Sequence, residues 1–159
     1  MKEFPILETN RLLLRPITMD DKATLYEIFK DEEMMIYYGM YPLKDMKAIT
    51  KLIKNFNKGF EEDRSIRWAI ELKEEHMLIG TCGFHNMNKH HRRSEIGYEI
   101  HKDYWRKGYV TEAVEEMMSY GMEEMALKRI EALIYPENIP SQKLLEKLGF
   151  TKEGLLKDY

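Results

Sequence analysis

A glycine between a strand-like and a helix-like stretch is the first feature of this sequence that could do chemistry. Before Gly108, polar and apolar residues alternate from 95 to 101, which predicts a strand. After it, apolar residues recur every three or four positions from 109 to 125, which predicts a helix. The first turn of a helix presents unpaired N–H groups and the positive end of the helix dipole, so main chain alone can bind a diphosphate there. The pattern indicates a site for a phosphorylated cofactor, and the alternative is a simple turn.

An acidic residue on the same strand could accept a proton. Glu99 shares one face of the expected strand with Glu95 and His101, because successive side chains alternate between faces. A carboxylate beside a buried cleft can take up a proton through a bound water. Glu131, on the next expected strand, is the alternative base.

Three blocks of the chain, taken together, are similar to one known family. The first is Leu7–Pro16, the second contains Trp105-Arg-Lys-Gly-Tyr-Val110, and the third, Asn138–Phe150, fits N-x-x-S-x-x-x-x-x-K-x-G-F. They resemble the GNAT acetyltransferase superfamily, and its RimJ/RimL-like branch in particular. In that family the second block is Q/R-x-x-G-x-G/A, and its amides wrap the pyrophosphate of coenzyme A. Val110 departs from the final Gly or Ala, which leaves its amide available but crowds the approach.

The resemblance implies an acyltransferase that moves an acetyl group from acetyl-CoA directly to a primary amine, either a protein N-terminus or a small-molecule amine. It implies that Asn138 contacts the pantetheine arm or the acceptor and that Ser141 protonates the departing thiolate. Some GNAT enzymes use a Tyr at the position of Leu145, so Ser141 is the better candidate here. The implied catalytic residues are Ser141 and Glu99, and the implied cofactor-binding residues are Ile100, His101, Arg106, Lys107, Gly108, Tyr109, Val110, Thr111 and Asn138.

The expected elements form one α+β layered domain over residues 1–159. They are strands at 11–15, 66–72, 77–84, 95–101 and 128–135, a strand from Phe150 onward, and helices from Thr18 or Asp20, at 44–60, at 109–125 and at 140–148. The resemblance implies a mixed, mostly antiparallel central sheet, splayed between its fourth and fifth strands, with helices on both faces. It also implies that the pantetheine arm pairs with the free backbone of Glu99, Ile100 and His101 in that splay.

Composition agrees with a globular enzyme. Apolar residues make up 43% and charged residues 33%, and the formal net charge of −3 argues against non-specific nucleic-acid binding. No apolar run approaches the roughly 20 residues of a membrane span, and no signal peptide is evident. The single Cys82 suits a reducing compartment, so we expect a cytoplasmic protein. His85, His90 and His91 lie in or beside a polar turn without accompanying ligands, so no metal site is expected.

Some interpretations stay open. The Met- and Tyr-rich stretch 33–42 holds no clean period and reads either as core or as a wall of the acceptor pocket. Val110, the missing Tyr and the chain end at Tyr159 leave a second function open, a CoA-binding regulatory or scaffold module without transfer activity. A nucleotide-binding protein unrelated to acyl transfer is a third. The family adds a further strand after the expected final strand, so an open sheet edge predicts either a homodimer or a labile C-terminal segment.

Overall fold

The computed structural model describes residues 2–38 and 40–156. Its centre is a six-stranded sheet in the order β1-β2-β3-β4-β5-β6, antiparallel throughout except for the parallel pair β5–β6. The strands are β1 (Leu7–Glu8), β2 (Leu12–Pro16), β3 (Ile66–Leu72), β4 (Met77–Asn88), β5 (Arg93–Ile100) and β6 (Arg129–Glu131). The α+β class and the mixed, mostly antiparallel sheet predicted from the sequence are confirmed.

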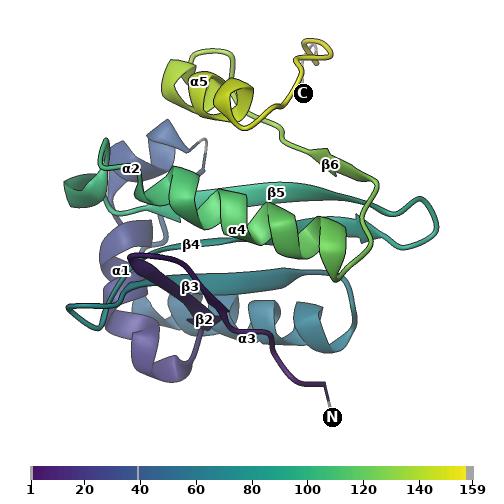
Figure 1. The fold of residues 1–159 in the computed structure, drawn as a ribbon. Coiled ribbons are helices and arrows are strands. Elements are labelled where there is room, and N and C mark those ends of the chain that lie inside the picture. The colour runs from purple at the N-terminus through teal and green to yellow at the C-terminus, as the bar shows by residue number, and fades with distance from the viewer. Residues whose placement is uncertain (1, 39, 157–159) are drawn as a thin grey trace.

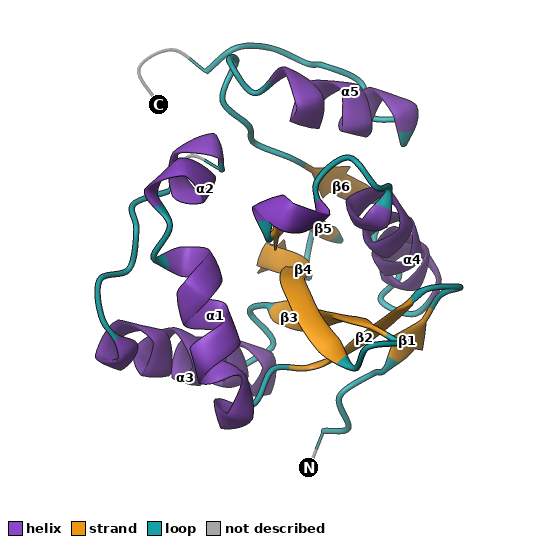
Figure 2. Ribbon diagram, turned by 90° about the vertical axis from the view of Figure 1, so that its left-hand side faces the viewer, coloured by secondary structure: helices purple, strands orange, loops and turns teal. Residues whose placement is uncertain are grey.

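Helices cover both faces of the sheet. The α-helices are α1 (Lys22–Phe29), α2 (Glu32–Tyr37), α3 (Met46–Glu61), α4 (Tyr109–Glu123) and α5 (Ile139–Lys147), with short 3-10 turns η1 (Met19–Asp21) and η2 (Lys102–Tyr104). Figure 2 shows α1, α2 and α3 on one side of the sheet and α4 on the other. In Figure 1, α5 and the C-terminal segment lie beyond β6, away from the N-terminus.

Each face of the sheet has its own apolar core, because the strands place alternate side chains on opposite faces and each helix turns one apolar side toward the sheet. The core under α4 includes Trp68, Ile70, Cys82, Phe84, Ile96, Ile100, Val114 and Met117. The core under α1 to α3 includes Leu25, Ile28, Phe29, Met34, Met35, Ile49, Ile53 and Ala69. Cys82 is fully buried within the first core. The β5 residues Ile96 and Ile100 face the first of these cores, so the residues that alternate with them along the strand face the other side of the sheet.

The stretch 33–42, which has no clean period, forms a helix at its start because a cap and two buried side chains fix it. The Asp31 carboxylate accepts the Met34 amide at 3.0 Å, which satisfies one of the unpaired donors at the start of α2. Met34 and Met35 are fully buried. A cap of this kind also begins α3, where Asp45 accepts the Ala48 amide at 2.8 Å. Short helices of this kind escape a search for periodicity.

The prediction of a strand from Phe150 onward is wrong for the described residues. Residues 150–156 form no regular structure, and 157–159 lie outside the described residues. The side chains of Leu155 and Leu156 remain 69% and 54% exposed, so burial does not hold the end of the segment against the sheet. It is attached at its start, where Phe150 packs against the core under α4, and by an ion pair in which Arg129 Nη1 donates to Glu153 Oε2 at 3.2 Å. The strand expected at 128–135 is also reduced, to Arg129–Glu131.

Candidate active site

The sheet opens between β5 and β6. Their parallel ladder pairs Arg93–Glu95 with Arg129–Glu131, and β5 then runs on to Ile100 beyond the last pair. Figure 1 shows the chain after β6 rising away from β5 toward α5. This is the splay that the resemblance implies, and it leaves the edge of β5 from residue 96 to Ile100 without a partner strand among the described residues; we call this stretch of edge the gap.

The backbone of Ile100 faces this gap. The next residue, His101, donates its amide back to Ile79 O on β4 at 2.7 Å, so by the alternation of a strand the Ile100 groups turn the other way. Ile100 donates its amide to Tyr38 Oη at 3.0 Å, and Trp105 Nε1 donates to Ile100 O at 2.8 Å. Two side chains thus occupy the position where an added strand would pair.

The same alternation decides which of the predicted pantetheine partners face the gap. The backbone of Glu99 turns toward β4, opposite Thr81, as that of His101 does. Of the three residues predicted, only Ile100 therefore presents backbone to the gap. The residue two positions earlier, Tyr98, presents its N–H and C=O on that side as well.

An aromatic cluster closes the end of the gap. The rings of Tyr37 and Trp105 lie 4.6 Å apart at 31°, and the Tyr38 ring meets Tyr37 edge-on at 5.1 Å. Tyr38 also meets Tyr98 edge-on at 6.5 Å. Burial raises the pKa of the Tyr38 hydroxyl above its ordinary value, and its hydrogen bond with Ile100 opposes that rise. Tyr38 therefore stays neutral and acts as a donor and acceptor, not as a base.

Gly108 is the N-cap of α4, as predicted, and takes a left-handed conformation with φ +80°. Arg106, two residues earlier, also has a positive φ of 64°. Positive φ is common for glycine and rare for other residues, so the loop 105–108 has a specific and costly shape. The turn ends where the first amides of α4 are unpaired, which is the geometry that binds an anion.

The residues expected to bind the cofactor are mostly gathered around that turn. Arg106, Lys107 and Gly108 are exposed, while Tyr109, Val110 and Thr111 are half-buried in the first turn of α4. Val110 is packed against the core under α4. His101 is turned to its own loop, where its Nδ1 accepts the Asp103 amide at 3.1 Å.

The Ser141 and Tyr98 side chains lie close together beside the gap. Ser141, in the first turn of α5, is 4% exposed. Burial raises the pKa of the Tyr98 hydroxyl, and the nearby Ser141 hydroxyl opposes that rise. No group stands in hydrogen-bonding geometry to Tyr98 Oη, however, and it is the one buried side-chain N or O atom without a partner within residues 2–38 and 40–156. A buried hydroxyl of this kind is costly unless something else, such as a substrate, completes its bonding.

Asn138 connects α5 to α2. Its Oδ1 accepts the Ser141 amide at 3.2 Å and so caps α5, and its Nδ2 donates to Tyr37 O at 3.1 Å. Both ends of the amide are used, which ties the helix that carries Ser141 to the aromatic cluster. Asn138 was predicted to contact the pantetheine arm or the acceptor, and its hydrogen bonds in this structure link two helices.

Glu99 points to the opposite face of β5, under α3. Its carboxylate accepts hydrogen bonds from Arg67 and, at 2.5 Å, from Thr81 Oγ1. The Arg67 guanidinium lies 5.7 Å from the ring of Phe56 on α3. The structure therefore does not bring Glu99 and Ser141 together on one face of β5. A reaction that uses both residues needs a substrate that lies between them at the open edge of β5.

His85 lies on the same face as Glu99. It was predicted to stand beside a polar turn, but β4 continues through Asn88, and Gly97 of β5 lies against the imidazole. Burial, followed by the charge of Arg67, holds the pKa of His85 below its ordinary value, so the ring is neutral and can accept a proton. The other base predicted, Glu131, accepts from Arg129 Nε at 3.0 Å on the short β6.

Sequence reasoning missed two of these side chains, Tyr98 and Arg67, and named Tyr38 only as part of the stretch 33–42. Tyr98 was grouped with Ile96 and Ile100 on an apolar face. A hydroxyl in the middle of an otherwise aliphatic face was the available signal, because a buried tyrosine usually finds a hydrogen-bond partner. Nothing in the spacing pointed to Arg67 or to the individual role of Tyr38, because their partners are distant in the sequence.

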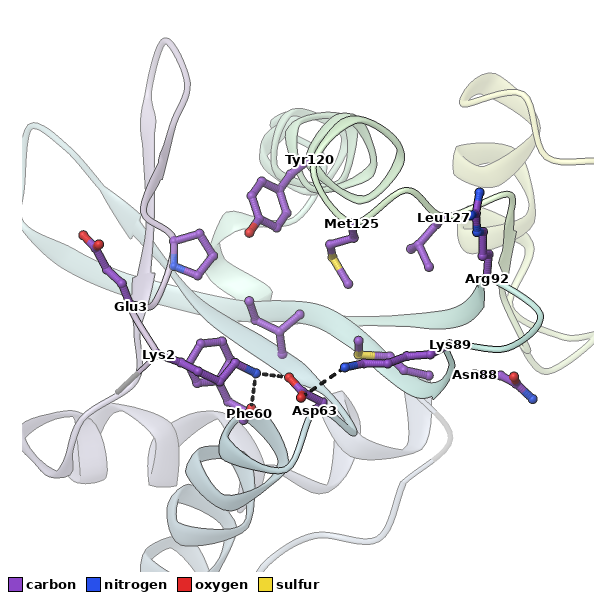
Figure 3. A pocket seen from close by; sticks show the side chains of 13 residues that line it. Lys2, Glu3, Phe60, Asp63, Asn88, Lys89, Arg92, Tyr120, Met125 and Leu127 are labelled. Atoms are coloured by element: carbon purple, nitrogen blue, oxygen red, sulfur yellow. Dashed lines mark hydrogen bonds and ion pairs between the residues drawn. The ribbon is translucent and has the colours of Figure 1, made fainter.

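A separate pocket lies at the other end of α4 (Figure 3). It has a volume of about 360 Å³ and is lined by α3, β4 and the end of α4, including Phe60, Met87, Tyr120, Met125 and Leu127. Figure 3 shows Lys2 and Lys89 both reaching Asp63 across it, the second pair at 3.1 Å. It shares no lining residue with the gap or with the turn at Gly108, so it is not a candidate for the transfer site.

Across the described residues, no helix is long and apolar enough to cross a membrane.

Comparison with known proteins agrees with this geometry. Residues 11–151 match the acetyltransferase (GNAT) domain family. The chain is 42% identical over 156 residues to the "Uncharacterized N-acetyltransferase YoaA" of Bacillus subtilis (strain 168), covering 98% of this chain and 88% of that protein. It is 27% identical over 143 residues to the spermidine N(1)-acetyltransferase of Escherichia coli (strain K12), covering 90% and 74%.

A solved structure shares the whole fold. It is RimL, a ribosomal L7/L12 alpha-N-protein acetyltransferase in complex with coenzyme A, which superposes with a TM-score of 0.87 at 15% identity over 94% of this chain and 86% of that one. At that identity the match shows the fold alone. The family match over most of the chain shows more: this chain belongs to the GNAT family of N-acetyltransferases, enzymes that take their acetyl group from acetyl-CoA.

Proposed function

We propose that this enzyme transfers the acetyl group of acetyl-CoA directly to a primary amine, in the gap between β5 and β6. The observation that carries the proposal is the end of the β5–β6 ladder at Glu95, which leaves the rest of that edge of β5, toward the N-terminus of α4 at Gly108, without a partner strand in the part of the chain that the structure describes. The diphosphate of the cosubstrate binds the amides of residues 108–111, with Arg106 and Lys107 exposed beside it. The pantetheine arm enters the gap toward Tyr98.

Three protein groups then act on the reaction. The deprotonated amine attacks the thioester carbonyl carbon, a C–N bond forms, the C–S bond breaks, and coenzyme A leaves as a thiol once a proton reaches its sulfur. Ser141 donates a hydrogen bond or a proton to that sulfur. The Tyr98 hydroxyl, which has no partner within the described residues and lies beside Ser141, relays the proton to it. Glu99 removes the proton of the amine through water from the opposite face of β5.

The base assignment has a direct rival in His85, which is neutral and lies on the same face. Glu99→Gln should lower kcat, with partial rescue at higher pH where more amine is deprotonated. If His85→Gln produces that loss and rescue while Glu99→Gln does not, the base is His85 and the Glu99 assignment is wrong.

The acceptor is a protein N-terminus or a small-molecule amine. A spermidine N(1)-acetyltransferase among the relatives supports a small-molecule amine, and the fold shared with a ribosomal L7/L12 alpha-N-protein acetyltransferase also accommodates a protein N-terminus in that enzyme. Release of coenzyme A thiol, measured with a panel of N-terminal peptides and polyamines, tests the proposal. Acetyl-dependent release with one amine class supports it. Binding of coenzyme A by calorimetry without release on any amine would favour a CoA-binding module instead.

A homodimer and a cytoplasmic location belong to the same proposal. The outer edge of β6 pairs with no strand in the described part of the chain, and Leu133 and Tyr135 beside it are 45% and 56% exposed, so a second copy could pair there. Sedimentation should give a dimer, whereas a monomer with strong hydrogen-exchange protection over 150–156 would show that the edge is covered from within. The buried, unpaired Cys82 fits a reducing compartment.

A further inference from the structure

Glu112, one turn inside α4, is bound by the turn between β1 and β2. Its carboxylate accepts three hydrogen bonds, from Thr9 Oγ1 at 2.5 Å, from the Arg11 amide at 2.8 Å and from Arg11 Nε at 2.7 Å. More than 100 residues separate the partners in sequence. The first and second blocks that carried the family resemblance are therefore physically joined.

The remainder of the Arg11 guanidinium lies on the loop before α4. Nη1 donates to Lys107 O at 3.1 Å, and the guanidinium carbon is 4.2 Å from the centre of the Tyr109 ring. Nη2 would be 3.3 Å from a Cβ built at Gly108. One side chain thus contacts the loop carbonyl and the first helical residue and lies beside the glycine.

This contact solves an electrostatic problem at the helix start. A carboxylate in the first turn competes with a bound anion for the positive end of the helix dipole. Arg11 pairs with Glu112 through Nε and holds Lys107 O through Nη1, so Nη2 remains beside Gly108 for an anion bound there. It also fixes a loop whose backbone has two residues at positive φ, Arg106 and Gly108.

We propose that Arg11 is a positioning residue of the cofactor site: it holds the loop 105–108 in the shape that binds the diphosphate of acetyl-CoA and adds a positive charge beside it. This inference rests on the proposed location of the diphosphate at the start of α4. It predicts a role specific to ligands that carry the diphosphate. A merely structural ion pair would affect every ligand of the enzyme in the same way.

Calorimetry on the full chain with two ligands tests this, using coenzyme A and pantetheine, which lacks the diphosphate. Arg11→Ala should weaken coenzyme A about tenfold, as expected for losing one charged contact, and change the affinity for pantetheine less than twofold. Arg11→Lys keeps the charge but cannot make the forked contacts, and should fall between the two. Arg64→Ala, which removes an exposed arginine paired with Glu62, is the control for net charge and should leave both affinities unchanged.

Equal weakening of both ligands by Arg11→Ala, or unchanged binding of coenzyme A in a folded variant, would overturn the assignment. If Arg11→Ala does not fold, the Arg11→Lys variant decides by the same comparison of ligands. Failure of the proposed function is a different result, because the unmodified chain would then release no coenzyme A thiol with any amine, whatever the two affinities are.

Discussion

Gly108 is the residue whose backbone most directly restricts substitution, because φ +80° is strained for any side chain and worst for a β-branched one. Gly108→Val should cost about 1–3 kcal/mol of stability and weaken coenzyme A at least tenfold, since the loop loses its shape and its close approach to the diphosphate. Calorimetry and thermal unfolding measure both effects.

Two further variants separate strain from blockage. Asn tolerates the left-handed region, so Gly108→Asn should keep the fold and lose affinity only if the side chain itself obstructs the ligand. Gly154→Val, at a glycine with nothing within 4 Å, is the neutral control. Unchanged affinity in a folded Gly108→Val would remove this residue from the cofactor site.

Variants of Tyr98 and Ser141 should change kcat without lowering the stability of the fold. Tyr98→Phe deletes a hydroxyl that has no partner, so the melting temperature should stay constant or rise, whereas kcat should fall if that hydroxyl assists the leaving thiolate. Ser141→Ala should lower kcat by roughly ten- to a thousandfold with little change in affinity for coenzyme A. Steady-state kinetics on the acceptor found by the amine screen measure both, and full turnover in either variant would contradict its role.

At the scale of elements, the Asn138 side chain links α5 to α2 through two hydrogen bonds. Asn138→Ala removes a helix cap and the bond to Tyr37 O, and should cost about 1–2 kcal/mol. Asn138→Asp keeps an oxygen for the cap but loses the donor to Tyr37, so it isolates the link between the helices. Urea unfolding gives both free energies. If the Asp variant matches the native chain in stability and kcat, the link to α2 is dispensable.

The long elements could be predicted from the sequence because their periods are strong. The expected helix 109–125 is α4 at Tyr109–Glu123, and the expected helix 44–60 is α3 at Met46–Glu61. The start of α4 at Gly108 was equally predictable, since a turn glycine separates two different periods.

What could not be predicted depends on contacts between distant segments. The short α2 is held by its cap and by burial, and the segment after Phe150 fails as a strand because no neighbour pairs with it. In the site, Glu99 was predicted on the correct face, but its pairing with Arg67 and Thr81 depends on the register of three strands. No spacing within one segment carries that information.

At the scale of the whole molecule, the joint between the N-terminal hairpin and α4 makes stability depend on pH. Burial acts to raise the pKa of Glu112, but hydrogen bonds from Thr9 and Arg11 outweigh it, and the pKa lies below its ordinary value of 4.5. A carboxyl group with a lowered pKa contributes stability above pH 4.5, and that contribution is lost as the pH falls through the folded-state pKa. Glu112→Gln should therefore cost about 1 kcal/mol near pH 7 and progressively less below pH 4.5.

Urea unfolding of both proteins between pH 3.5 and 7 measures this difference. Glu153→Gln, which removes an exposed carboxylate near the C-terminal end, is the matched control and should show a much smaller effect. A Glu112→Gln penalty that stays constant down to pH 3.5 would show that the carboxylate charge is not what joins the hairpin to the helix.

The buried sulfur at the centre of the sheet has a practical consequence for the laboratory. Cys82 is the only cysteine in the sequence, is fully buried, and has its pKa raised by burial to about 12. Since the thiolate is the species that reacts with disulfide reagents, we expect the folded chain to give no colour in a thiol assay, so that each equivalent of colour corresponds to one released coenzyme A. In the absence of substrate, the rate at which excess reagent labels this one thiol measures how often the central strands open.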